Sequence, residues 1–134
     1  MNGYLLDTSF VIAYFNEISD RRNGPARQYL ASLPGLRRLY VSTVTLAEVL
    51  EGAIDARIAE QELRRLAGFV SLGAETARRC ALNQRRAKAA GRRMGENDAW
   101  IAATAELSDL DLIGHDEAFK GRSRLRYLDF VQTG

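Results

Sequence analysis

Residues 95–105 read GENDAWIAATA, and this stretch bears on the fold more than any other in the chain. From Asp98 to Ala105 the side chains are apolar on almost every side, which predicts a buried helix. Asn97 suits the N-cap of a helix that begins near Asp98. Asp98 is therefore predicted to be a carboxylate at the N-terminus of a buried helix, where the helix dipole favours its charged form.

Short apolar segments flank that helix and alternate with helical patterns along the chain. Strands are predicted at 3–6, 39–42, 69–72, 112–114 and 127–131. Helices are predicted at 10–15, with Ser9 as N-cap, and at 25–33, 43–54, 56–66 and 74–90, while 17–24 is predicted to be a polar loop. This alternation predicts an α/β fold with a parallel sheet covered on both faces.

Length and composition indicate one ordinary globular domain over residues 1–134. The chain has a mass of 14.9 kDa, with 46% hydrophobic and 27% charged residues. These values exclude a collagen-like chain, a disordered tail and a disulfide-rich secreted peptide.

Cysteine and histidine usage narrows the chemistry further. Cys80 is the sole cysteine and His115 the sole histidine, so an intrachain disulfide and the usual Cys/His zinc sites are excluded. The apolar stretch 4–15 carries Asp7 in its middle and fits neither a signal peptide nor a membrane span. We expect a cytoplasmic protein with no membrane partner.

Four acids share one predicted location. Asp7 and Asp116 follow predicted strands, Asp98 opens the buried helix, and Glu48 lies on a helix that follows a strand. Open α/β sheets bind ligands beyond the carboxyl ends of their strands. Carboxylates gathered there repel each other unless a cation neutralises them, and oxygen ligands suit Mg²⁺ or Mn²⁺. Such a site can hydrolyse phosphodiesters.

Each acid also has a structural interpretation. Asp7 could be a turn residue, Asp98 only a helix cap, and Asp116 a polar strand exit. Glu48 could lie on a solvent face, which is the interpretation we favour for Glu51 and Asp55. The shared placement of the four favours a common site.

Other catalytic patterns are missing from the sequence. The phosphate-binding glycine motifs, H-E-x-x-H and G-x-S-x-G do not occur. A Ser-His-Asp triad would need His115, for which the sequence shows no orienting partner. Cys80 and Trp100 are both predicted as core residues.

The basic residues are unevenly distributed. Net charge is only +2, yet 17 of the 19 basic residues are Arg. The stretch from Arg78 to Arg93 contains seven basic residues and no acid, and 21–46 is a second acid-free basic stretch. Arginine suits phosphate, so nucleic acid is one interpretation and a solvated helix face the other.

Four segments in this order resemble a PIN domain. They are YLLDTS at 4–9, VSTVTLAEV at 41–49, NDAWIAATA at 97–105 and IGHDEAF at 113–119. Within that fold the chain is similar to VapC-type toxins of bacterial toxin–antitoxin pairs.

The resemblance implies a five-stranded parallel sheet and a Mg²⁺-dependent endoribonuclease, with Mn²⁺ as a substitute ion. Asp7, Glu48, Asp98 and Asp116 match the family's acidic quartet, and Thr8 or Ser9 matches its hydroxyl position. The resemblance also implies a homodimer and a VapB-like antitoxin whose tail occupies the active site, often with an Arg near the carboxylates.

Our mechanistic hypothesis assigns Mg²⁺ to Asp7 and Asp98, helped by Asp116. Glu48 binds through water or positions the attacking water, and the Arg78 to Arg93 stretch guides RNA. Three alternatives stay open: a non-catalytic PIN-like scaffold, a DNA nuclease of the same fold, and a phosphoacceptor receiver domain with Lys120 in its pocket.

Overall fold

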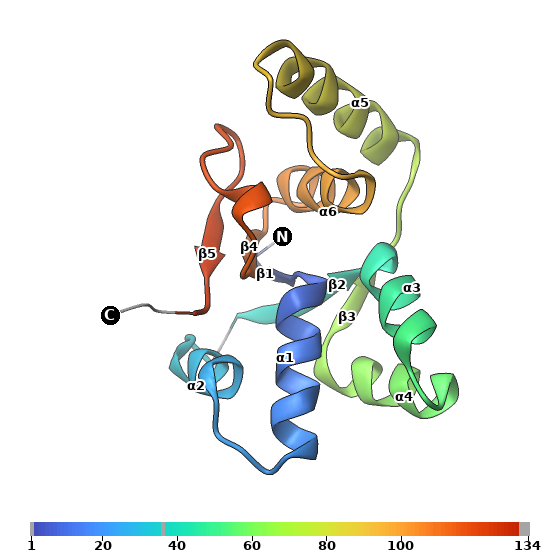
Figure 1. Cartoon of the computed structure of the whole chain (residues 1–134), viewed down its shortest axis with the longest axis vertical. Coiled ribbons are helices and arrows are strands. Elements are labelled where there is room, and N and C mark those ends of the chain that lie inside the picture. The colour runs from blue at the N-terminus through green and yellow to red at the C-terminus, as the bar shows by residue number, and fades with distance from the viewer. Residues whose placement is uncertain (1, 36, 132–134) are drawn as a thin grey trace.

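A five-stranded parallel sheet forms the centre of the computed structural model, which describes residues 2–35 and 37–131 (Figure 1). The strand order is β3-β2-β1-β4-β5, and every neighbouring pair is parallel. The strands are β1 (Gly3–Leu6), β2 (Arg38–Ser42), β3 (Gly68–Val70), β4 (Asp111–Gly114) and β5 (Tyr127–Asp129). The predicted α/β fold class is confirmed.

Helices cover both faces of this sheet (Figure 1). They are α1 (Thr8–Ser19), α2 (Pro25–Ser32), α3 (Thr43–Gly52), α4 (Ala56–Leu66), α5 (Ala74–Ala89) and α6 (Glu96–Leu107), with a 3-10 turn, η1 (Glu117–Phe119). Within the described ranges, no helix combines the length and the apolar character that crossing a bilayer requires.

The side chains of β1 and β4 point alternately to the two faces of the sheet, and each face has its own core cluster. Tyr4, Leu6 and Ile113 pack with residues of α1 to α4, whereas Leu5 and Leu112 pack with residues of α5 and α6. Successive strand residues point to opposite faces, so both faces of the central strands are buried. Cys80 and Trp100 belong to the second cluster, the first buried and the second partly so, in line with their predicted core roles.

The chain reverses its direction of travel across the sheet between β1 and β4. From β1 it moves to β2 and β3 on one side, and β4 then pairs with the other side of β1. The carboxyl ends of β1 and β4 therefore border a topological switch point, where open α/β sheets bind ligands. The order also differs from the 2-1-3-4-5 sheet of receiver domains, which disfavours that alternative.

The predicted loop at 17–24 was wrong at its start, because α1 continues to Ser19. Glu17 is only 2% exposed, and its carboxylate accepts the backbone N–H groups of Ala26 (3.0 Å) and Arg27 (2.9 Å). These N–H groups belong to the first turn of α2, where a carboxylate satisfies unpaired donors. A polar composition does not reveal this contact between two segments.

The predicted helix at 43–54 was also too long at its end. The helix ends at Gly52, and its buried residues are Thr45 and Val49. Ile54 lies fully exposed in the turn between α3 and α4, so the helix does not extend to this apolar residue. Glu51 and Asp55 are exposed, as the solvent-face interpretation predicted. The predicted strand ends at residues 72 and 131 lie two residues too late, since β3 ends at Val70 and β5 at Asp129.

Candidate active site

Asp7 links the first strand to the first helix. Its backbone N–H donates to the carbonyl of Ile113 (2.8 Å), which continues the β1–β4 ladder by one residue. Its side chain caps α1, because Oδ1 accepts the N–H of Thr8 (2.7 Å). The N-cap is thus Asp7 and not Ser9, whose hydroxyl donates to Asp7 Oδ2 (2.8 Å). Only 3% of Asp7 is exposed.

Gly114 gives the Asp7 carboxylate its space at the end of β4. A Cβ at position 114 would lie 2.7 Å from Asp7 Oδ2, closer than real contacts allow. Any larger residue would push the carboxylate aside.

Glu48 faces the same edge from α3. Thr8 Oγ1 donates to Glu48 Oε1 (2.7 Å), and the hydroxyls of Thr8 and Thr45 are hydrogen-bonded at 3.0 Å. Glu48 therefore lies beside the residue that follows Asp7 instead of on a solvent face. The two hydroxyls after Asp7 divide their roles, since Thr8 orients Glu48 and Ser9 orients Asp7.

Asp98 lies in the first turn of α6 and is partly buried. The predicted cap at Asn97 was wrong, because Gly95 is the N-cap and its carbonyl accepts the N–H of Ala99 (2.9 Å). Asn97 is exposed. The helix begins two residues earlier than predicted, but Asp98 keeps its place at the positive end of the helix dipole.

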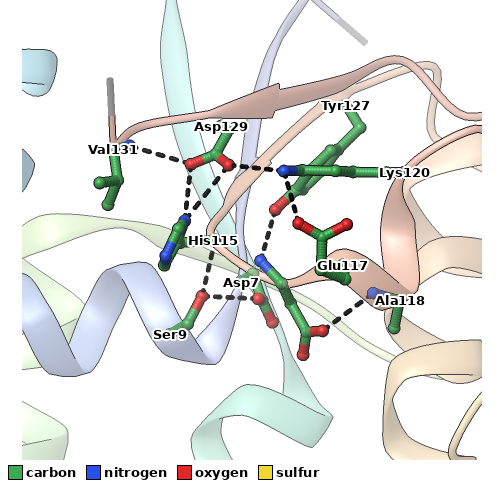
Figure 2. A network of polar contacts seen from close by, with 10 residues as sticks. Asp7, Ser9, His115, Glu117, Ala118, Lys120, Tyr127, Asp129 and Val131 are labelled. Atoms are coloured by element: carbon green, nitrogen blue, oxygen red, sulfur yellow. Dashed lines mark hydrogen bonds and ion pairs between the residues drawn. The ribbon is translucent and has the colours of Figure 1, made fainter. Parts of the chain in front are cut away.

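Asp116 is the exposed member of the set. It lies two residues beyond β4 and caps η1, with Oδ1 accepting the N–H of Ala118 (2.9 Å). Its backbone N–H donates to the hydroxyl of Tyr127 (2.8 Å), which ties this loop to β5 (Figure 2).

The carboxylates act on one another electrostatically. Burial raises the pKa of Asp7 to about 6, and Asp98 and Asp116 add to the rise against the hydrogen bonds from Ser9 and Thr8. Burial also raises the pKa of Asp98, with Asp116 and Glu48 contributing. Among the described residues, none of these four acids forms an ion pair. Negative charge is thus concentrated where no cationic side chain of the described residues lies within ion-pairing distance.

Comparison with known proteins decides the family. The family model described as "PIN domain" matches residues 4–125. The chain belongs to the PIN domain family. No curated protein matches the sequence significantly.

Solved structures resemble this PIN domain over nearly its whole length. A chain of VapBC2 from Rickettsia felis, solved bound to a promoter DNA fragment, has a TM-score of 0.78 at 19% identity, covering 94% of this chain and 97% of that one. A chain of VapBC-1 from nontypeable Haemophilus influenzae has a TM-score of 0.75 at 24% identity, and the match covers 95% of this chain and 97% of that one. A chain of VapBC-5 from Mycobacterium tuberculosis, a member of the VapBC family of toxin–antitoxin systems, has a TM-score of 0.63 at 27% identity. The match covers 96% of this chain and 98% of that one.

The donor set of this PIN domain fits a hard divalent cation. All four side chains offer carboxylate oxygens, and Asp7 combines a buried charge with close acidic neighbours. Within the described ranges, no three acidic, His or Cys side chains form a ready-made cage. Mg²⁺ does not need one, because it keeps several waters and is held by one or two carboxylates together with substrate phosphates.

A polar network behind the acids contains residues that the sequence did not single out (Figure 2). His115 Nδ1 lies 2.9 Å from Asp129 Oδ1, so His115 has the orienting partner that the sequence did not show. The triad is still not assembled, because the Ser9 hydroxyl donates to Asp7 and accepts the backbone N–H of His115 (3.0 Å). Tyr127 and Asp129 lie two residues apart on β5 and so share one face of the strand beside β4, and that spacing is the one signal that could have found them.

Lys120 does not serve the acidic edge. Its ammonium lies 2.9 Å from Glu117 Oε1 and 3.4 Å from Asp129 Oδ2, and the bond to Glu117 raises its pKa. The lysine of the receiver-domain alternative is therefore paired elsewhere.

Three arginines of the stretch from Arg78 to Arg93 have partners within the fold. Arg79 bonds to the Glu106 carboxylate (3.2 Å), and Arg93 approaches Glu96 (3.7 Å). Arg92 donates to two backbone carbonyls of the loop that follows η1. Only part of the stretch is left to meet a ligand.

Proposed function

We propose that this PIN domain is a Mg²⁺-dependent endoribonuclease and the toxin of a type II toxin–antitoxin pair. One observation supports the proposal: four carboxylates near the carboxyl edge of the sheet interact electrostatically, and among the described residues no cationic side chain pairs with them. A site of this kind binds a divalent cation and, through it, a phosphate.

Each acid then has a distinct part in the proposal. Asp7 and Asp98 hold the ion, because both are held within the fold at the ends of secondary-structure elements. Asp116 completes the set from the exposed loop, and η1 and Tyr127 fix its position. Glu48, oriented by Thr8, holds or positions the attacking water.

A bound cation would neutralise the carboxylates and stabilise the charge that develops on the phosphate during hydrolysis. The side chains themselves supply geometry. Hydrogen bonds from Thr8 and Ser9 hold Asp7 in one orientation before any ligand arrives, which lowers the reorganisation that binding requires.

The proposed partners are an RNA substrate and a VapB-like antitoxin in the cytoplasm, with a homodimer as the assembly. The support is the likeness to chains of VapBC complexes. An antitoxin arginine near Asp7 would neutralise the acids in the absence of substrate, since guanidinium–carboxylate pairs are strong hydrogen-bonded contacts.

Cleavage of total RNA by the purified, antitoxin-free chain tests the proposal. We expect discrete fragments with Mg²⁺, none with EDTA, and none from Asp7→Asn or Asp98→Asn. Glu117→Gln is the matched control, because Glu117 is an exposed acid next to Asp116 that bonds to Lys120. It should cleave like the unsubstituted chain.

Other outcomes would contradict parts of the proposal. Cleavage of single-stranded DNA but not RNA would make the chain a DNA nuclease of the same fold. Intact nucleic acid from a folded sample whose melting temperature ignores Mn²⁺ would indicate a non-catalytic scaffold.

A further inference from the structure

A cationic hollow lies away from the acids, between α5, α6 and the loop that precedes β5. Its volume is about 210 Å³, and four arginines line it: Arg86, Arg92, Arg122 and Arg124. Apolar side chains, among them Met94 and Ala102, form part of its wall. In Figure 1, α6 lies between α5 and the sheet.

Backbone carbonyls, and not acids, hold two of these arginines in place. Arg92 donates to the carbonyls of Lys120 (2.8 Å) and Gly121 (3.4 Å). Arg122 donates to the carbonyls of Ala118 (2.9 Å) and Arg92 (2.6 Å). Carbonyls orient a guanidinium without cancelling its charge, and burial together with Arg92 lowers the pKa of Arg122. The fold therefore fixes two like charges side by side.

The acid in the lining does not neutralise them. Glu106 has a side chain only 6% exposed, and its two oxygens bond to Arg79 (3.2 Å) and Asn83 (2.7 Å). Among the described residues, the side chains of Arg86 and Arg124 have no ion-pair or hydrogen-bond partner. The hollow thus presents two fixed and two uncommitted guanidinium groups, a set suited to a phosphate.

The hollow lies along the same helix as the candidate active site. Asp98, Ala102 and Glu106 follow at intervals of four on α6, so they lie along one side of the helix. At 1.5 Å per residue, Ala102 and Glu106 lie roughly 6 and 12 Å along the axis from Asp98. A strand that runs along α6 would therefore reach the hollow within a few nucleotides of Asp98.

We propose that this hollow binds a backbone phosphate of the RNA a few nucleotides from the cleaved bond, and so sets the path of the substrate along α6. The proposal rests on the proposed ribonuclease function and adds a subsite to it. The apolar part of the wall, with Met94, would receive the sugar or base attached to that phosphate.

The salt dependence of RNA binding tests the subsite. In the Asp98→Asn background, the affinity for a fluorescein-labelled single-stranded RNA would be measured by anisotropy over a KCl series. Each lost phosphate contact lowers the log–log slope by about 0.7 on a single strand. We expect that decrease, with several-fold weaker binding, from the double variant Arg86→Gln/Arg124→Gln, and a smaller decrease from each single variant.

Arg85→Gln is the matched control. Arg85 precedes Arg86 on α5, is exposed and lies outside the hollow, and its side chain has no ion-pair or hydrogen-bond partner among the described residues. The substitution Arg85→Gln removes the same charge as Arg86→Gln and should change the salt-dependence slope much less. Equal effects of Arg85→Gln and Arg86→Gln would overturn the subsite in favour of diffuse attraction, and so would an unchanged slope in the double variant.

Cleavage by the chain with Asp98 intact separates this proposal from the function on which it rests. With the subsite in use, the double Arg variant should raise KM and leave kcat unchanged. Slope changes confined to the hollow without any cleavage would support the subsite and contradict the nuclease. Mg²⁺-dependent cleavage with unchanged KM and slope would support the nuclease and contradict the subsite.

Discussion

Replacing Asp7 by Asn should stabilise the fold at neutral pH, although it should abolish activity. Burial raises the pKa of this carboxyl from 3.8 to about 6 in the folded chain. A difference of that size corresponds to about 3 kcal/mol of unfolding free energy once the group is ionised in both states. Asn keeps an acceptor for the Thr8 N–H but loses the charge-assisted bond from Ser9, which costs about 1 kcal/mol. The expected net gain is about 2 kcal/mol.

The pH dependence separates this effect from ordinary repacking. Below about pH 4 the carboxyl is protonated in both states, so its burial carries no charge penalty. As the pH rises, the unfolded chain ionises first, and the penalty grows until it is complete above about pH 6. The stability difference between Asp7→Asn and the unsubstituted chain should therefore increase from about pH 4 to pH 6 and then level off.

Urea unfolding with EDTA present, followed by circular dichroism across this pH range, measures the difference. Asp109→Asn is a control of opposite sign, because Asp109 is exposed and the hydrogen bond from Arg126 lowers its pKa. Asn tolerates the positive φ of 52° at that position. A stability difference for Asp7→Asn that does not change with pH would refute the reasoning.

Three further substitutions probe the surroundings of this carboxylate. Gly114→Ala should push Asp7 aside and remove the Mg²⁺-dependent rise in melting temperature that the unsubstituted chain is expected to show; an unchanged rise would contradict the close contact. Thr8→Val should lower kcat at least tenfold by releasing Glu48 while costing only about 1 kcal/mol of stability, with Thr8→Ser retaining activity as the control. Glu17→Ala should lower the urea-unfolding free energy by about 3 kcal/mol, because two N–H groups of α2 lose their acceptor, and Glu17→Gln should cost less.

The strands and the positions of the acids could be predicted from the sequence because burial dictates both. A parallel strand covered on two faces needs an apolar run, and residues 3–6 and 112–114 have one. The first polar residue after such a run is then placed at the sheet edge, as Asp7 is. The buried helix that presents Asp98 was equally visible, because its apolar character on all sides leaves no solvent face.

Contacts between distant segments could not be predicted in the same way. The carboxylate of Glu17 caps α2, and Asp129 is hydrogen-bonded to His115. No local sequence pattern indicates either of these two contacts. The basic stretch is a further example. The arginines of this stretch indicated positive charge on α5. Only the packing of α5 on α6 shows that Glu106 pairs with Arg79, whereas Arg86 lines the hollow.

Stability and function oppose each other at Asp7, and this opposition explains how the site is built. One residue extends the β1–β4 ladder, caps α1 and carries a buried charge. The ladder and the cap fix its position, so the carboxylate cannot move into water to avoid the cost of burial. The interaction that removes this cost is neutralisation, by a proton below about pH 6 or by a bound cation above it. The same rigidity that makes an ionised Asp7 destabilising without a bound cation makes it a preorganised ligand. Metal binding should therefore stabilise the unsubstituted chain, whereas it should leave Asp7→Asn, which lacks the buried charge, almost unchanged.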